Sequence, residues 1–212
     1  MSYQSKTAKI LIDIKAINFN FKSPYILTSG RKSPVYVDCR KIISFTKERS
    51  QIISFIQKYI IKHNIKFDLL AGGETAGIPY ASFLAERLKK PMIYIRKQPK
   101  KFGKGSQIEG SFKKNQRSIL IEDLATDGKS KMTFVNVMRK NNLKVNEAFV
   151  IFYYDIFKKS EQELKESKIK IHYLCTWKDI LNEIKKQKII EKKDIESVER
   201  FLSNPVKWDE NE

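Results

Sequence analysis

Apolar residues recur along the chain with two spacings that alternate. Helical spacing, with apolar positions three and four residues apart, occurs in TKERSQIISFIQKYIIKHN, IPYASFLAERLKK and KSKMTFVNVMRKNN. Short apolar runs typical of strands stand around these segments: FDLLAGG, PMIYIR, SILI, EAFVIFYY and KIKIHYL. EAFVIFYY is apolar for most of its length, as expected of a strand whose sheet is covered by helices on both faces. This alternation predicts an α/β fold with a mostly parallel, twisted sheet flanked by helices.

The ends of the chain depart from this alternation. The first 45 residues combine a short helix-like segment, TAKILIDIKAI, with an irregular stretch that contains two prolines and the strand VYVD. Thr46 is the predicted cap of the next helix, and two amphipathic helices are predicted from Trp177 onward. The segment KQPKKFGKGSQIEGSFKKNQR is predicted to be a long polar loop. We predict one domain over residues 1–212, divided into an N-terminal segment (1–45), an α/β core (46–174) and a C-terminal helical extension (175–212).

Composition limits the classes of protein that remain. At 212 residues and 41% hydrophobic, the chain can bury a sizeable core. No apolar run approaches the length of a membrane span, and the N-terminus lacks the order of a signal peptide. The two cysteines, Cys39 and Cys175, lie far apart in sequence and argue against a disulfide framework. We therefore predict a cytoplasmic protein with no membrane partner.

The formal net charge of +18 raises the question of a nucleic-acid partner. Only eight of the 42 basic residues are Arg, the residue that contacts to base edges and phosphates favour. The lysines occur in every segment, and a bias in codon composition explains that pattern as well as a partner does. We predict that nucleic acid is not the main partner, while an anionic small substrate would benefit from the same positive field.

The stretch SILIEDLATDGKSK, from Ser118 to Lys131, places two acids directly after an apolar run. Ligands of parallel α/β sheets bind beyond the carboxyl ends of the strands, and free N–H groups at a helix N-terminus suit a phosphate. A P-loop would need a glycine where Asp123 stands, and the dinucleotide-binding fingerprint would need one where Ile108 stands. Two acids before a phosphate-binding turn suit a sugar phosphate, whose hydroxyls would donate hydrogen bonds to the carboxylates. The alternative is that Glu122 and Asp123 cap a loop and face solvent.

Four stretches together resemble one known family. ILIEDLATDGKS resembles the motif of type I phosphoribosyltransferases that binds 5-phosphoribosyl 1-pyrophosphate (PRPP). YILTSGRKSPVYVD and IRKQPKKFGKGSQIEG resemble signature segments of the orotate phosphoribosyltransferase family, and GGETAGIPYASFLAERL is similar to its pyrophosphate loop and following helix. The four occur in the family's order, and the resemblance covers roughly Phe19 to Tyr154.

The resemblance implies a fold, an activity and partners. It implies a type I phosphoribosyltransferase-like fold in which residues 1–45 form a hood that recognises the base. The implied reaction joins orotate and PRPP to give orotidine 5′-monophosphate and pyrophosphate, in the biosynthesis of UMP. Mg²⁺ is expected to be held mainly by PRPP and water, without a metal site built from protein ligands alone. A homodimer is implied, with the loop from Arg96 to Gly110 closing as a lid over the neighbouring subunit's active site.

The resemblance also assigns site residues. Those implied in catalysis are Lys97, Lys100 and Asp123, with Lys100 assisting the departure of pyrophosphate. The implied PRPP-binding residues are Arg96, Lys97, Lys100, Glu122, Asp123, Leu124, Ala125, Thr126, Asp127, Gly128, Lys129 and Ser130. The implied pyrophosphate loop comprises Gly72, Gly73, Glu74, Thr75 and Ala76. The implied orotate-binding residues are Ser29, Gly30, Arg31, Tyr36 and Thr126, and the sequence leaves open whether Arg31 points into the site or braces the fold.

Several positions depart from the pattern of well-known family members. Thr28 and Ala76 stand where lysines are familiar, Phe102 replaces a lid histidine, and Lys129 replaces the second glycine of the PRPP turn. Ile156 and Phe157 follow Asp155 where an arginine facing orotate was expected. The lost charge could be compensated by one of Lys101, Lys129 and Lys158. His63 and His172 are predicted to be structural or surface residues.

Three other functions stay open at the level of sequence. A type I phosphoribosyltransferase for another base would share Glu122 to Ser130 but would not need SGRKSPVYVD. A PRPP-sensing regulator on the same fold would bind nucleic acid with a steep salt dependence. A catalytically inactive scaffold would explain the lost lid histidine.

Overall fold

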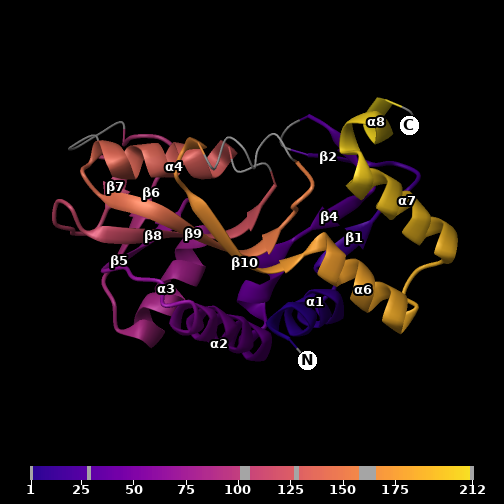
Figure 1. Ribbon diagram of the computed structural model, residues 1–212, viewed down its shortest axis with the longest axis horizontal. Coiled ribbons are helices and arrows are strands. Elements are labelled where there is room, and N and C mark those ends of the chain that lie inside the picture. Colours follow the sequence, from indigo (N-terminus) through magenta and orange to yellow (C-terminus); the bar gives the residue numbers. More distant parts are fainter. Residues whose placement is uncertain (1, 28–29, 101–105, 127–128, 158–165, 211–212) are drawn as a thin grey trace.

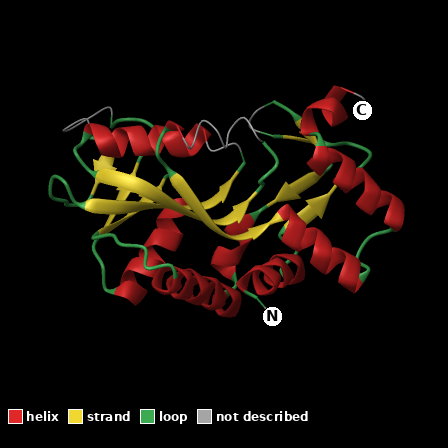
Figure 2. Ribbon diagram, viewed as in Figure 1, coloured by secondary structure: helices red, strands yellow, loops and turns green. Residues whose placement is uncertain are grey.

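A six-stranded sheet forms the centre of the fold (Figures 1 and 2). The computed structural model describes residues 2–27, 30–100, 106–126, 129–157 and 166–210. The strands lie in the order β10-β9-β8-β5-β6-β7, and every neighbouring pair is parallel except β6 and β7. Their bounds are β5 Leu69–Gly73, β6 Met92–Ile95, β7 Ile108–Glu109, β8 Arg117–Ala125, β9 Lys144–Tyr153 and β10 Lys170–Thr176. The predicted fold class is confirmed.

Helices cover both faces of this sheet, which explains why its central strands carry long buried apolar runs, such as residues 119–121 of β8 and 148–153 of β9. Helices α1, α2 and α3 lie below the sheet in Figure 1, and α4 lies above it. Successive side chains of β8 point alternately to the two faces of the sheet. Ile119 and Ile121 pack in the core of the lower layer, and Leu120 packs with Phe134 of α4. The bounds are α1 Tyr3–Asp13, α2 Thr46–Lys62, α3 Gly77–Leu88 and α4 Lys129–Lys140.

The N-terminal segment forms a small hood of short strands beside the main sheet. Strand β1 pairs antiparallel with β4, and β2 pairs antiparallel with β3. A 3-10 helix then leads into α2, with Cys39 and Ile42 buried in the core. The bounds are β1 Ile17–Phe19, β2 Tyr25–Ile26, β3 Lys32–Ser33, β4 Val35–Val37 and η1 Cys39–Ser44.

The C-terminal extension consists of three helices rather than the two predicted. They are α6 Trp177–Gln187, α7 Lys192–Ser203 and α8 Pro205–Glu210. The extension begins at Trp177, because β10 continues to Thr176 and the side chains of Thr176 and Asp179 form a capping box. Helix α6 packs on α1 and α8 packs on β3. The extension therefore packs against both α1 and the hood (Figure 1).

Other element boundaries differ from the sequence-based expectations. Helix α1 starts at Tyr3 because the side chain of Ser2 accepts a hydrogen bond from the N–H of Ser5. Helix α2 has Phe45 rather than Thr46 at its cap, since the N–H of Arg49 bonds to the Phe45 carbonyl. The long polar loop contains β7, whose pairing with β6 buries Ile108.

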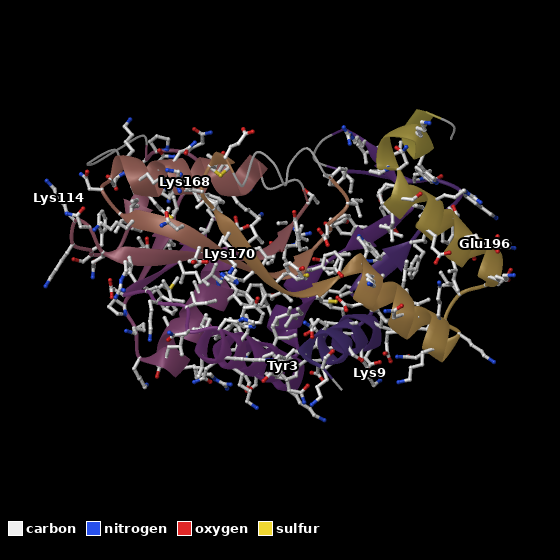
Figure 3. The ribbon with its side chains drawn as sticks, in the orientation of Figure 1. Tyr3, Lys9, Lys114, Lys168, Lys170 and Glu196 are labelled. Carbon is white, nitrogen blue, oxygen red and sulfur yellow. The ribbon has the colours of Figure 1, made fainter. Side chains whose placement is uncertain are left out.

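The excess lysines are spread over the molecule. Figure 3 places Lys114 at one end of the long axis and Lys9 on α1 in the opposite half. Lys168 and Lys170 lie between them, and all four are exposed. Their positions over different elements are consistent with a compositional origin of the charge. Within the described ranges, no helix is both long and apolar enough to cross a membrane.

Candidate active site

A cavity of about 510 Å³ opens beyond the carboxyl ends of the two central strands β5 and β8. The chain leaves β5 through α3 on one face of the sheet and leaves β8 through α4 on the other face (Figure 1). Such a divergence creates a crevice between neighbouring strands. The residues that line it are Ile26, Leu27, Tyr36, Val37, Arg40, Glu74, Thr75, Ala76, Lys97, Glu122, Asp123, Leu124, Thr126, Lys131, Phe134 and Tyr154.

Glu122 and Asp123 both reach this cavity, from opposite faces of the same strand. The sequence suggested that the apolar strand ends before the acids, but β8 stays paired with β9 as far as Ala125. Glu122 therefore points toward α4, and Asp123 points toward the hood. The two residues are only 6% and 8% exposed. The alternative that they cap a loop in solvent does not hold.

The Glu122 carboxylate is packed tightly at the bottom of the cavity. Its Oε2 atom lies 3.0 Å from Nζ of Lys131, a buried residue in the first turn of α4. Its Oε1 atom is buried and has no hydrogen-bond partner among the described residues. A Cβ atom on Gly73 or Gly77 would overlap this carboxylate, so both positions require glycine. The unpartnered Oε1 is the oxygen that packs against Gly73 and Gly77, and the residue as a whole lines the cavity.

Burial dominates the protonation of both acids. It raises the pKa of Glu122 to about 7, while the charge of Lys131 opposes the rise and that of Asp123 adds to it. Burial also raises the pKa of Asp123, against the charge of Lys131 and a hydrogen bond from the N–H of Leu124. Both groups would gain from hydroxyl donors, because hydrogen bonds to a carboxylate stabilise its charged form.

The implied pyrophosphate loop divides into a buried and an exposed part. Gly72 and Gly73 belong to β5 and pair with β6, so their role is close packing rather than an open cradle of N–H groups. The part that borders the cavity is Glu74 to Ala76, and the peptide bond between Glu74 and Thr75 is cis. Glu74 is held at both ends: its N–H donates to the Ile95 carbonyl, and its Oε2 accepts from the N–H of Lys97 at 2.6 Å.

Of the three implied lid cations, only Lys97 lines the cavity. Lys100 Nζ lies 2.6 Å from Oε1 of Glu109, and Arg96 Nη1 lies 4.0 Å from the same oxygen. Glu109 stands on β7, the short strand that the sequence did not predict. It forms an ion pair with each of the two cations. Sequence reasoning missed Glu109, although it belongs to the QIEG end of the lid segment.

On the orotate side, Tyr36 and Thr126 line the cavity. Gly30 has a φ of 83° and closes a turn through a hydrogen bond from its N–H to the Leu27 carbonyl. The Arg31 guanidinium lies over the ring of Phe157, 5.5 Å from its centroid. Arg31 is not among the lining residues of the cavity.

Some implied site residues lie outside the described part of the chain: Ser29, Asp127 and Gly128. The same holds for Thr28, Lys101, Phe102 and Lys158. Lys129 and Ser130 begin α4, but their side chains are not described. Leu124 borders the cavity, whereas Ala125 is fully buried and its carbonyl accepts a hydrogen bond from the N–H of Tyr154.

Several lining residues carry no signal that sequence reasoning used. Lys131 stands nine residues after Glu122, and only the turn from β8 into α4 brings the two together. Arg40 follows the predicted strand VYVD, and the hood folds it toward the sheet. Ile26, Phe134 and Tyr154 supply apolar wall.

The histidines lie away from the cavity. His172 Nε2 is 2.5 Å from Oε2 of Glu147, and Nδ1 is 3.3 Å from the Tyr59 hydroxyl. Burial lowers the pKa of His172 against the pull of Glu147. The ring of His63 stacks on Tyr59. Within the described ranges, no group of three or more His, Cys, Asp or Glu side chains is arranged to hold a metal ion.

The fold and site together define a type I phosphoribosyltransferase: two acids at the end of a central strand, a short loop after the neighbouring strand and a hood above them. Solved structures agree. The chain superposes on Leishmania donovani UMP synthase with a TM-score of 0.80 and 26% identity, covering 93% of this chain and 42% of that one. It superposes on orotate phosphoribosyltransferase from Aeropyrum pernix with a TM-score of 0.72 and 27% identity, covering 84% and 99%.

Sequence comparison identifies the family. The chain is 44% identical over 206 residues to orotate phosphoribosyltransferase of Roseobacter denitrificans, covering 96% of this chain and 92% of the relative. It is 46% identical over 203 residues to the Rhizobium rhizogenes protein of the same name, covering 95% and 88%. No family model matches the chain. The chain belongs to the orotate phosphoribosyltransferase family.

Proposed function

We infer that this chain is a pentosyltransferase that moves the phosphoribosyl group of PRPP to orotate, forming orotidine 5′-monophosphate and pyrophosphate for pyrimidine biosynthesis. The observation that carries the inference is the pair Glu122 and Asp123, which enter one cavity from opposite faces of β8 beside the loop from Glu74 to Ala76. A ribose ring between a base and a pyrophosphate needs such an arrangement: hydroxyl acceptors in the middle and separate sites at the two ends.

The two carboxylates are proposed to hold the ribose hydroxyls. Glu122 offers a buried oxygen that has no partner within the described residues, and Asp123 faces the same space from the other side. Ionised acceptors inside a buried site make strong hydrogen bonds. Breaking the anomeric C–O bond places positive charge on the ribosyl centre, and two nearby carboxylates favour that charge over the neutral ground state.

The pyrophosphate is proposed to leave toward the loop after β5. Lys97 lines that end of the cavity, and its own N–H fixes Glu74 of the loop. Lys100 and Arg96 lie at Glu109 and are proposed to transfer to the leaving group in the neighbouring subunit's site when substrate is bound there. Developing negative charge on pyrophosphate would draw both cations from a partly exposed carboxylate.

Mg²⁺ is proposed as the cofactor. The carboxylates of Glu74, Glu122 and Asp123 line one cavity, and carboxylate oxygens are the ligands that Mg²⁺ prefers. These side chains would stand around an ion held mainly by substrate phosphates and water. When bound, Mg²⁺ would neutralise phosphate charge.

The test is the loss of orotate absorbance after PRPP and Mg²⁺ are added to the purified protein, with Asp123→Asn as the matched variant. We expect the absorbance to decrease only when PRPP is present. The rate of this decrease should be at least about 100-fold lower in the variant. If a purine or uracil is turned over and orotate is not, that base and not orotate is the substrate. PRPP binding without turnover of any base, together with salt-sensitive RNA binding, would favour the regulator.

A cytoplasmic homodimer with shared active sites is also proposed. Its support is the position of Lys100, which meets β7 of its own chain instead of lining its own cavity. Lys100→Ala and Asp123→Asn damage different parts of a shared site. If Lys100 serves the neighbouring subunit, mixing and refolding the two inactive variants restores about a quarter of wild-type activity, because one site in each heterodimer is intact. Activity no higher than that of the separate variants would contradict the shared site.

A further inference from the structure

The hood side of the cavity has the shape and chemistry of a site for a planar ring. Ile26, Leu27, Val37 and Tyr154 give it apolar walls, and Tyr36 adds an aromatic face. Tyr36 is itself positioned by Tyr25, whose ring centroid lies 5.6 Å away. On the function proposed above, this end holds the base, which in orotate carries a carboxylate. An anion placed among apolar walls requires a cationic partner.

Three cations among the described residues line the cavity, and two of them belong to other parts of it than the hood side. Lys131 is buried and paired with Glu122 on the α4 side. Lys97 stands after β6 beside the pyrophosphate loop, at the opposite end from the hood. Arg40 is the third, and it belongs to the hood side, because its Nη2 atom donates a hydrogen bond of 2.8 Å to the hydroxyl of Tyr36.

The Arg40 guanidinium is fixed in orientation while one edge stays open. Its Nε atom donates to Oδ1 of Asp38 at 3.0 Å, and its Nη1 atom finds no acceptor in the described part of the chain. The side chain is 57% exposed and lines the cavity, and the hydrogen bonds to Asp38 and Tyr36 leave the Nη1–Nη2 edge for a further acceptor. A guanidinium held along one side presents two parallel N–H groups on the other, the geometry that a carboxylate matches.

The backbone that carries Arg40 is rigidly placed. The neighbouring Cys39 is fully buried, and its carbonyl accepts a hydrogen bond of 2.6 Å from the hydroxyl of Tyr80 on α3. The N–H of Asp38 donates to the Ala16 carbonyl at 2.8 Å. The two residues before Arg40 are thus tied to the core, which holds the guanidinium at a constant position relative to the cavity.

We propose that Arg40 binds the carboxylate of orotate and is the residue by which this enzyme selects orotate over bases that lack a carboxylate. The proposal rests on the function proposed above. Arg31, the other arginine of the hood, lies over the ring of Phe157 outside the cavity lining and cannot take this role from that position.

The experiment measures steady-state rates with orotate and PRPP for the wild type, Arg40→Gln, Arg40→Lys and Lys41→Gln. Lys41→Gln is the matched control, because it removes one positive charge at the next residue, where the side chain reaches the Lys15 carbonyl, away from the cavity. Arg40→Gln is expected to raise KM for orotate about 10- to 100-fold, the effect of losing a charged hydrogen-bonded pair. KM for PRPP should change less than about twofold, the scatter of surface substitutions. Arg40→Lys should fall between, and Lys41→Gln should match the wild type.

A second measurement separates carboxylate recognition from a general loss of the site. Orotamide, in which a neutral amide replaces the carboxylate, is used as a competitive inhibitor of each variant. Its inhibition constant should be nearly the same for Arg40→Gln and wild type, while KM for orotate differs. An unchanged KM for orotate, an increase confined to PRPP, or an equal loss of orotamide binding would each overturn the proposal. A wild type inactive with orotate would instead refute the proposed function.

Discussion

Lys131 Nζ lies 3.0 Å from Glu122 Oε2, and both side chains are 7% exposed. A buried ion pair contributes little net stability, because the desolvation of both charges offsets their attraction. Its importance here is positional: the ammonium group holds one carboxylate oxygen toward α4, while the other packs against Gly73 and Gly77 beside the cavity. The pair therefore connects the start of α4 to the end of β8 at the point where the ribose is proposed to bind.

Replacing Lys131 with Met should leave a buried carboxylate without its counter-charge. We expect a loss of about 3 kcal/mol in the free energy of unfolding at pH 8, where Glu122 is ionised. The loss should be smaller at pH 6, because protonation relieves the unpaired charge. Urea unfolding at the two pH values measures this. The control is Lys140→Met at the exposed end of the same helix, and an equal loss at both pH values would contradict the assignment.

The raised pKa of Glu122 predicts a pH dependence of stability with a definite sign. This pKa is about 7 in the folded chain against an ordinary value of 4.5, so the folded state binds more protons than the unfolded state between these limits. The stabilisation that comes from protonated Glu122 is fully present below about pH 4.5 and is lost as the pH rises through 7. The free energy of unfolding falls by up to about 3 kcal/mol over this range. Glu122→Gln cannot ionise and should lack this fall.

Urea unfolding from pH 5 to 8 compares Glu122→Gln with the wild type. Glu196→Gln, an exposed change on α7 (Figure 3), is the control and should follow the wild type. Parallel curves for wild type and Glu122→Gln would count against a buried, titrating Glu122.

Two glycine substitutions should differ in their cost and in its origin. A Cβ on Gly77 would overlap the backbone carbonyl of Ile121, which cannot move without disturbing β8. Gly77→Ala is expected to cost about 3 kcal/mol and to reduce kcat. Gly30→Ala meets no atom within 4 Å but has a φ of 83°, so it should cost only the backbone strain of about 1 kcal/mol. Thermal unfolding and steady-state rates measure both. Equal costs would show that overlap with β8 does not govern position 77.

Glu109 should restrain the lid cations in the absence of substrate. Glu109→Gln removes the charge that holds Lys100 at 2.6 Å and attracts Arg96. A partly exposed ion pair is worth up to about 1 kcal/mol, so KM for PRPP should fall about two- to fivefold. Glu199→Gln, which breaks an exposed pair with Lys185 on the C-terminal helices, is the control. A rise in KM would mean that Glu109 positions the cations for binding instead of restraining them.

The sequence predicted the parts of the site that lie close together along the chain. The change of spacing between SILI and KSKMTFVNVMRKNN predicted a phosphate-binding turn after a strand, which stays a prediction, and the comparisons confirm the fold and the family that this motif indicated. Helix and strand type followed from periodicity because the central elements are long and covered on both faces.

The parts that were missed depend on contacts between distant segments. Arg40 faces the cavity only because β4 and η1 are tied to Ala16 and Tyr80. Strand β7 is two residues long, so it has no period of its own and exists through its pairing with β6. The extent of β8 was underestimated because charged residues argue against a buried strand. Pairing of the backbone with β9 and the positive charge of Lys131 allow Glu122 to be buried there.

The tight packing of Glu122 against Gly73 links two positions that lie 49 residues apart in sequence. Because the carboxylate occupies the volume where a side chain at 73 would stand, the two residues share one space. Divergence at one should therefore be accompanied by change at the other. A family member that carries a side chain at the position of Gly73 is expected to have the shorter aspartate at the position of Glu122. Glu122 and Gly73 would then change together in evolution, although they are far apart in the sequence.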